Sequence, residues 1–374
     1  MAALEPPDEP TGAAGPDADL VDELTEDLAD ELAEGSRPPR PKRWWVLPLR
    51  IAISLAMLWF LIHKIAAVSF ADLVPEWSTT ALAWTLVALA LSVLAVALSA
   101  ARWHQVLTAM GVGDVRFSRL LSHYFAGQFV SNVLPTTIGG DVLRVSRLAG
   151  DTGEPATSFA SVIIERLTGW LVLPLLTATG FLLAPEARHL GRPTSLALAI
   201  AGGTLVALVA ILFVADHPRL GGRFATRQGW RRFIGSVHLG VNRMRRHPRA
   251  ATTVVLVGVA YQAVLVLAAA AGARALGITG AGFPVLLAVF PAVLIAQVLP
   301  IGISGLGVRE GALVIFLSPL GVPEKQAVAL GIFVFALNLI VSLLGAPAFA
   351  TGSRQARVRA ATTAATTTGS SIDT

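Results

Sequence analysis

The chain has 374 residues, of which 54% are hydrophobic and only 14% are charged, and its mean hydropathy is +0.67. A soluble globular domain carries about 25% charged residues, so the composition excludes such a domain and indicates a protein whose main solvent is lipid. Because there is no cysteine, the chain has no disulfide framework and no thiolate metal site or nucleophile.

Charge is distributed unevenly along the chain, whose formal net charge is +5. Residues 1–36 hold 12 of the 24 acidic residues and no Lys or Arg, which leaves 29 basic against 12 acidic residues (24 − 12) in the rest. This composition predicts a disordered acidic cytoplasmic tail. Its leucines at every fourth position, from Leu20 to Leu32, indicate either a transient helix or a docking helix for a basic surface. The acidic start does not resemble a secretory signal peptide, so the first apolar segment is expected to remain as an anchor.

Apolar segments long enough to cross a bilayer core of about 30 Å recur along the chain. They are 46–63, 81–101, 167–184, 194–215, 252–272 and 326–350, with interrupted apolar stretches at 120–138 and 284–320. We therefore predict an all-α, polytopic helical membrane protein with about eight membrane segments, two of them broken and either re-entrant or fully spanning. The transmembrane domain is expected to cover 44–350, and 351–374 to form a flexible cytoplasmic tail.

Arginine and lysine in the short loops set the expected orientation. The loop 216–250 has nine arginines against one acid, Asp216, and the flanks before 46–63 and after 326–350 are also basic, so both termini are predicted to be cytoplasmic. Basic residues at both ends of 120–138 place both ends on the cytoplasmic side. The outer loop 185–193, with Arg188 and Arg192, fits this orientation least well.

The arginine-rich loop has a helical pattern of its own. Arg219, Arg223, Arg227 and Arg231 lie four apart, with Phe224 and Trp230 between them and Phe233 and Ile234 just after. This spacing predicts a basic amphipathic helix on the cytoplasmic leaflet, although the positive-inside rule alone also explains the charge. The helix offers a docking site to the acidic tail. Nucleic-acid binding is not expected, because the basic residues belong to a membrane-embedded chain.

Two segments of the chain resemble each other at an offset of 165 residues. Residues 132–145 read NVLPTTIGGDVLRV and residues 297–310 read QVLPIGISGLGVRE, with six of 14 positions identical, including Pro135/Pro300, Gly140/Gly305 and Arg144/Arg309. Three predicted spans separate the copies, so the second copy enters the membrane from the opposite side to the first. Inverted repeats interrupted by Gly and Pro indicate a transporter-type site at the interface between the repeats.

The repeated residues favour an anionic ligand. Pro135 and Pro300 are expected to break their helices and to expose backbone groups, which must then line a polar cavity. A helix that restarts after the glycines directs its N-terminal amides towards the break, and Arg144 and Arg309 add a bidentate phosphate donor. A phosphate-bearing ligand fits this chemistry. The alternative is that these are ordinary helix ends, with both arginines reaching to lipid headgroups.

Several other charges lie at membrane depth, where they are costly unless they are functional or paired. Asp141 and Arg144 are three apart and can pair on a helix. Glu165 and Arg166 are expected to open the third span, and Arg309 and Glu310 to close the second repeat. Because adjacent residues on a helix do not face each other, each of these four needs a partner elsewhere. We expect Glu165 or Glu310 to pair with an arginine of the other repeat; mutual neutralisation for membrane insertion is the alternative.

Three ordered motifs resemble a known family: FVSNVLPTTIGGDVLRVSRLAG (129–150), ASVIIERLTGW (160–170) and LPIGISGLGVREGAL (299–313). They are similar to the flippase-like integral membrane family that includes the transmembrane region of lysylphosphatidylglycerol synthases. The resemblance implies a plasma-membrane bundle of about eight helices that moves or presents a lipid-phosphate substrate. The positions that match the family motifs, with Pro300 added from the repeat, are the candidate lipid-binding residues: Asn132, Pro135, Gly139, Gly140, Asp141, Arg144, Glu165, Arg166, Pro300, Gly305, Gly307, Arg309 and Glu310. The full synthases also carry a soluble aminoacyl-transfer domain, and no such activity is expected of this chain.

Three functions follow from these patterns. The first is translocation of a phospholipid or polyprenyl-phosphate-linked lipid. The second is a scaffold that presents lipid to a partner lipid or glycan synthase. The third, an enzyme acting on lipid phosphates, is disfavoured because only Asp141 and Glu165 form a plausible acid–base pair. No cofactor or metal is expected, and the chain has no GxxxxGK[ST] nucleotide-binding loop.

Overall fold

The computed structural model describes residues 59, 78–112, 115–133, 139–216, 230–298 and 305–351. All regular structure within these residues is helical, which confirms the all-α prediction. Five of the described helices are long and apolar enough to cross a membrane: α3 (Thr79–Ala109), α6 (Pro155–Leu183), α7 (Arg192–Asp216), α10 (Pro248–Ala275) and α13 (Glu324–Leu343). The acidic tail, the predicted first span and residues 352–374 lie outside the described residues.

Two of the long helices extend beyond the apolar runs that predicted them. α3 has 31 residues, about 46 Å at 1.5 Å per residue. It continues past Arg102 because Trp103 and Val106 follow at helical spacing and are fully buried. α6 begins at Pro155, a residue suited to the first turn of a helix. Glu165 therefore lies inside a long helix, and the prediction that it opens the third span is wrong.

Each of the two broken segments forms a helical hairpin. In the first, α4 (Phe117–Val133) is followed by α5 (Gly139–Thr152), and the guanidinium of Arg119 makes two hydrogen bonds of 2.6 Å to the carboxylate of Asp151. The start of α4 thus lies beside the end of α5, so the two helices are antiparallel. Residues 134–138, with Pro135, lie outside the described residues.

The second hairpin consists of α11 (Phe283–Ala296) and α12 (Val308–Leu317). At its tip, a Cβ placed on Gly305 would lie 2.6 Å from the Cβ of Gln297, and near its base a Cβ on Gly280 would lie 3.1 Å from Val322. The two arms of this hairpin are therefore antiparallel as well. Residues 299–304, with Pro300, lie outside the described residues.

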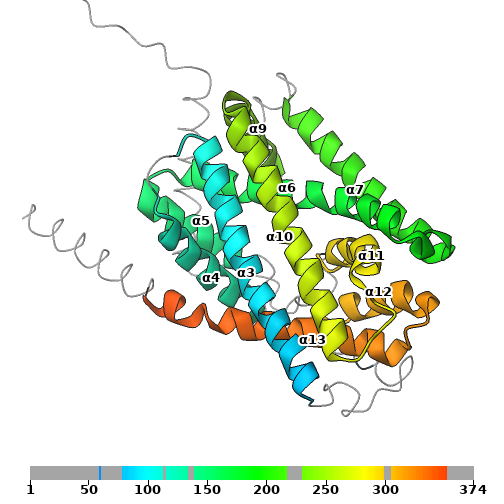
Figure 1. Ribbon diagram of the computed structural model, residues 1–374. Coiled ribbons are helices and arrows are strands. Elements are labelled where there is room, and N and C mark those ends of the chain that lie inside the picture. Colours follow the sequence, from blue (N-terminus) through cyan, green and yellow to red (C-terminus); the bar gives the residue numbers. More distant parts are fainter. Residues whose placement is uncertain are drawn as a thin grey trace, which may run out of the picture.

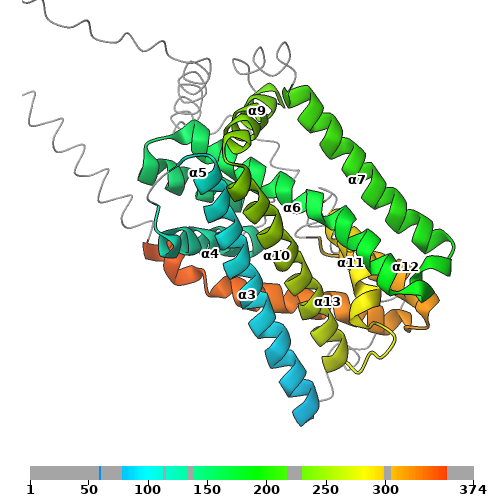
Figure 2. The same cartoon turned by 45° about the horizontal axis from the view of Figure 1, so that its top comes forward.

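The two hairpins belong to an inverted repeat. The order α3-α4-α5-α6 corresponds to α10-α11-α12-α13, and α6 packs on α11 just as α13 packs on α4 (Figure 1). The initial helices of the two copies, α3 and α10, lie side by side in both views (Figure 2). They are antiparallel, because Val106 clusters with Val254 whereas Ala88 clusters with Ala271.

One pair of glycines shows that the repeat extends beyond the sequence motif. A Cβ on Gly180, at the end of α6, would lie 2.1 Å from the backbone nitrogen of Ala288 in α11. A Cβ on Gly345, just after α13, would lie 2.0 Å from the carbonyl oxygen of Phe125 in α4. The two glycines are also 165 residues apart (345 − 180). In each copy, a glycine lets the last helix touch the backbone of the other copy's hairpin.

In the part of the chain that the structure describes, two α-helices lie between the copies. α7 lies at the edge of the bundle (Figure 1), and only 17% of its most apolar 18-residue stretch is buried. α9 (Trp230–Arg246) is amphipathic and packs Ile234 and Val237 against α6 and α7. α9 overlaps the predicted amphipathic helix only from Trp230 to Ile234, where Ile234 packs within the protein, so the placement of that helix on the leaflet stays a prediction. Arg219, Arg223 and Arg227 lie outside the described residues.

The arginine that fitted the predicted orientation poorly has a structural role. Arg188 lies in the short 3-10 helix η3 (Pro185–His189), after the end of α6. Its guanidinium donates to the carbonyl oxygens of Phe181 and Leu182, the latter at 2.9 Å. These carbonyls have no partner within α6, so Arg188 caps the helix.

Candidate functional site

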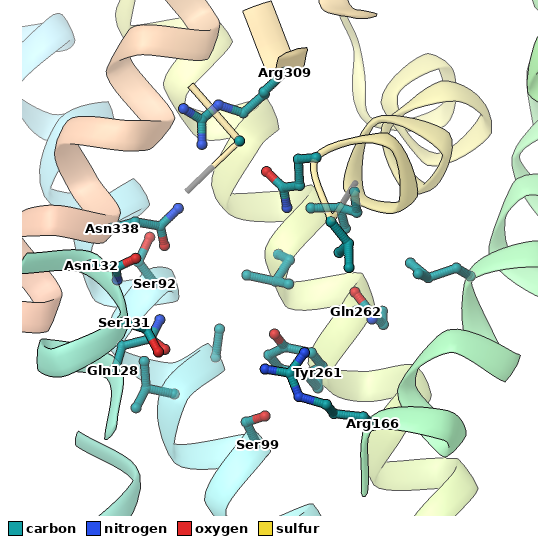
Figure 3. A pocket seen from close by; sticks show the side chains of 18 of the residues that line it. Ser92, Ser99, Gln128, Ser131, Asn132, Arg166, Tyr261, Gln262, Arg309 and Asn338 are labelled. Atoms are coloured by element: carbon teal, nitrogen blue, oxygen red, sulfur yellow. The ribbon is translucent and has the colours of Figure 1, made fainter. Parts of the chain in front are cut away.

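Two adjoining polar cavities lie between the repeats, with volumes of about 370 Å³ and 220 Å³. Helices of both copies line the larger cavity: α3, α4 and α6 of the first, and α10 to α13 of the second. Tyr124, Gln128, Arg166 and Tyr261 are among the residues that line both cavities, so the two are contiguous. Figure 3 shows the polar side chains around the larger cavity, with Arg309 at one end and Ser99 and Arg166 at the other.

The tips of the two hairpins meet at this cavity. Asn132 at the end of α4 and Gln297 just after α11 occupy equivalent positions of the repeat, and both line the larger cavity. Gly305 also lines it and has a φ of +73°. A side chain with a Cβ would be strained there by its backbone angle, so the repeated glycine serves the turn of the hairpin.

A buried network of charges borders the smaller cavity. The carboxylate of Glu165, 1% exposed, accepts hydrogen bonds from Arg102 and, at 3.1 Å, from Arg144. Asp141 extends the network, since one of its oxygens lies 3.4 Å from Arg144 and the other pairs with Arg166. The three arginines and two carboxylates carry a net charge of +1 (3 − 2).

Two aromatic rings lie beside the guanidinium of Arg144. Its Cζ lies 4.3 Å from the ring centroid of Trp103 and 4.1 Å from that of Tyr124, a geometry that stabilises the cation. The side chain of Arg144 also fits against Gly127, where a Cβ would lie 2.9 Å from its Cγ. Tyr261, from the second copy, covers Arg102, whose Cζ lies 4.9 Å from its ring centroid. A side chain of the second repeat therefore contacts the charge network of the first.

The network has buried N–H donors with no acceptor among the described residues. They are Nε of Arg144 and both Nε and Nη1 of Arg102. Leaving charged donors without acceptors at membrane depth is costly. The combination of these donors with a positive net charge favours an anion at this end of the cavity.

The equivalent charges of the second copy are arranged differently. Arg309 pairs with the adjacent Glu310, Nη2 to Oε1 at 2.8 Å, and the other oxygen of Glu310 accepts the N–H of Gly307 at 2.6 Å. Glu310 thus caps the start of α12, so this amide is not available to a ligand in the break. Gly307 has a φ of +84°, a backbone angle that favours glycine.

Four predictions about these charges can now be judged. The pairing of Asp141 with Arg144 is confirmed. The prediction that Glu165 or Glu310 pairs with an arginine of the other repeat is wrong, because the arginines that pair with them among the described residues lie in the same repeat as the carboxylate. The prediction that each charge needs a partner other than its neighbour holds for Glu165, which pairs with Arg102 and Arg144. It is wrong for Glu310, which pairs with the adjacent Arg309. Glu310 lies in the first turn of α12, so its side chain reaches back to the start of the helix. Arg309 and Glu310 also open α12 rather than close the second repeat.

Most of the candidate residues come together at the two cavities. Those that line them are Asn132, Gly140, Asp141, Arg144, Glu165, Arg166, Gly305 and Arg309. Gly139, Gly307 and Glu310 are not among the lining residues, and Glu310 instead holds Arg309. Pro135 and Pro300 lie outside the described residues.

Sequence reasoning missed three residues of the site. Arg102 directly follows the predicted span 81–101, so it falls outside the apolar run. Tyr124 and Tyr261 are the only two tyrosines of the chain, and both line the two cavities. Their rarity, together with their position in apolar segments, was the signal that could have found them.

Comparison with known proteins gives one positive result. A family model described as the lysylphosphatidylglycerol synthase TM region matches residues 47–345, which is most of the chain. A search of curated proteins found no match.

Proposed function

We propose that this chain, which belongs to the family of the lysylphosphatidylglycerol synthase transmembrane region, binds the phosphate-bearing headgroup of a lipid between its two hairpins and transfers it across the bilayer. The chain is a multi-pass membrane protein of a family linked to lipid handling. We further propose that it works in the plasma membrane, with both termini in the cytoplasm, and leaves the lipid chemically unchanged.

The observation that carries the proposal is the position of the larger cavity. It lies where hairpins from opposite ends of the bundle meet, and both copies of the inverted repeat line it. Such an arrangement allows access from either side in turn when one repeat moves against the other. The volume of about 370 Å³ falls within the range of roughly 300–1,000 Å³ of small-molecule sites.

The charges support a phosphate ligand. Arg166 and Arg309 both line the larger cavity, and each comes from a different repeat. Arginine binds phosphate oxygens with two parallel hydrogen bonds. Arg102 and Arg144, which have buried N–H donors without an acceptor among the described residues, line the adjoining cavity. A phosphate that moves along the path thus meets a cation at each end.

The test is lipid transfer in liposomes that contain the purified protein and a fluorescent anionic phospholipid. We expect wild-type protein to move the lipid between leaflets and Arg166→Gln to slow this transfer about tenfold or more. Arg119→Gln is a matched control: the two side chains are 44% and 47% exposed and each pairs with one aspartate, but Arg119 lines neither cavity. The control is expected to retain the wild-type rate.

The same assay separates the alternatives. Lipid binding without transfer would indicate a scaffold that presents lipid to a partner synthase. A change in the mass of the lipid would indicate an enzyme. Equal rates for Arg166→Gln and Arg119→Gln would refute the role of the cavity.

A further inference from the structure

A third cavity lies where α3 ends and α4 begins, and we call it the α3–α4 groove. Its volume is about 500 Å³, and none of the described residues that line it also lines the two cavities between the repeats. Four apolar side chains form much of its wall: Leu107, Val112, Val115 and Phe117. Phe117 is 41% exposed, so its ring offers apolar surface to a ligand. The groove is therefore a separate feature that the proposed function does not use.

A basic surface adjoins the groove. Met244 of α9 and Val112 of the groove pack against the same buried cluster, and α9 lies at the same end of the bundle as the end of α3 in both views (Figures 1 and 2). The exposed arginines of this surface line the groove or lie at the junction of α9 with α10, and they are Arg116, Arg245, Arg246 and Arg249. The groove thus combines an apolar wall with a positively charged border.

The sequence around this surface contains few carboxylates. Between Asp216 and Glu310 there is no Asp or Glu, and no acidic residue is among the described residues that line the groove. The acidic tail, in contrast, holds half of all the acidic residues of the chain. It is the largest concentration of negative charge that the chain can bring to the arginines.

One segment of the tail matches both properties of the groove. Residues 17–34 contain nine acidic residues and no Lys, Arg or Pro. On a helix, the leucines at every fourth position from Leu20 to Leu32 would form one apolar stripe, with carboxylates on the other faces. Amphipathic helices bind apolar grooves through anchors at this spacing. The leucines therefore suit the wall of the groove, and the carboxylates suit its border.

The tail is expected on the same side of the membrane as the groove. The predicted span 46–63 and α3 are the two expected crossings that separate them. The connecting residues 35–45 reach up to about 40 Å when extended, which exceeds the width of about 30 Å of a small domain. The segment can therefore lie across this end of the bundle.

We propose that residues 17–34 dock as an amphipathic helix in the α3–α4 groove, with their leucines on its apolar wall and their carboxylates beside the arginines of the basic surface. The docked segment covers a surface that otherwise attracts the anionic headgroups of the leaflet. The proposal is independent of lipid transfer, because the groove and the cavities between the repeats share no described residue.

The test measures the distance between two spin labels on the full chain in nanodiscs of phosphatidylcholine. Because the chain has no cysteine, Ala29→Cys in the tail and His247→Cys beside the basic surface are its only labelling sites. We expect a short, narrow distance for this pair. A long, broad distance is expected for Ala29→Cys with Ser195→Cys, which is exposed at the start of α7, at the other end of the bundle.

Salt tests the electrostatic part of the docking. Raising its concentration from about 0.1 M to 1 M shortens the Debye length from about 10 Å to 3 Å, and should lower the ratio of docked to free tail at least about twofold. Arg245→Gln combined with Arg246→Gln should lower this ratio about threefold. Arg192→Gln is the control, because Arg192 is also exposed but lies at the start of α7, and it should leave the ratio unchanged.

A second pair of variants tests the apolar part. Leu24→Asn combined with Leu28→Asn should lower the ratio of docked to free tail about tenfold or more, because two apolar anchors leave the groove. Thr25→Asn is the matched control, since Thr25 belongs to the same segment but not to the leucine stripe.

Two results would overturn the proposal. Equally long and broad distances for both label pairs would show that the tail does not dock at this surface. Equal effects of the leucine variant and Thr25→Asn would show that the groove does not hold the leucine stripe. A short distance to His247→Cys that both the leucine and the arginine variants lengthen supports the proposal, whether or not the protein transfers lipid.

Discussion

Replacing Glu165 by glutamine is the sharpest test of the buried charge network. The substitution keeps the shape of the side chain but removes the charge that lies between Arg102 and Arg144. At an effective dielectric constant of about 20, a charge pair at the observed 3.1 Å is worth about 5 kcal/mol. Breaking a buried pair from one side typically costs about 3–5 kcal/mol, and we expect a loss in this range because the local charge rises from +1 to +2.

The measurement is thermal unfolding of the purified protein in detergent, followed by tryptophan fluorescence. Glu154→Gln is the control, because Glu154 directly precedes the same helix, makes no side-chain capping hydrogen bond and is exposed; its effect should stay within about 0.5 kcal/mol. Combining Glu165→Gln with Arg102→Met removes one charge of each sign. The double variant should therefore be destabilised by less than the sum of the single variants. A stability of Glu165→Gln equal to that of Glu154→Gln, or additive effects in the double variant, would refute the network.

Two further predictions concern the packing and the base of the first hairpin. Gly180→Ala and Gly345→Ala should each lower the unfolding temperature, because the new methyl group overlaps backbone atoms that cannot move aside. Gly203→Ala in α7 is the control: its methyl group meets nothing within 4 Å, so the unfolding temperature should stay unchanged. Burial raises the pKa of Asp151, but hydrogen bonds from Arg119 and His123 outweigh this effect and hold it below its ordinary value. The stabilisation by this carboxylate is therefore fully present above pH about 3.9 and is lost as the pH falls through the lowered pKa. The difference in unfolding temperature between wild type and Asp151→Asn should accordingly shrink from pH 7 to pH 3.

The sequence predicted the features that local rules determine. Proline and glycine at matched offsets indicated two broken segments, and the structure contains two hairpins there. The spacing of Asp141 and Arg144 was enough to predict their contact, because residues three apart share one face of a helix. The inverted order of the copies followed from the count of spans between them.

The partners of the remaining charges depend on tertiary packing and could not be predicted in this way. Arg102 meets Glu165 only because α3 continues two turns beyond its apolar run and packs against α6. The partner of Glu310 depends on the geometry of a helix cap that begins at Gly307 with a positive φ. The equivalence of Gly180 and Gly345 was invisible in the sequence because no other residue around them is repeated in a recognisable pattern.

The central claim is that a lipid headgroup occupies the cavity between the two hairpins, and photo-crosslinking tests it most directly. A phosphatidylglycerol with a photoreactive headgroup would be incorporated into nanodiscs with the protein, irradiated, and mapped by mass spectrometry. The account predicts crosslinks on cavity residues of both copies, such as Gln128 on α4 and Asn338 on α13, that excess unlabelled lipid suppresses. Crosslinks confined to lipid-facing residues such as Val206 and Phe213 of α7, each 70% exposed, would contradict it.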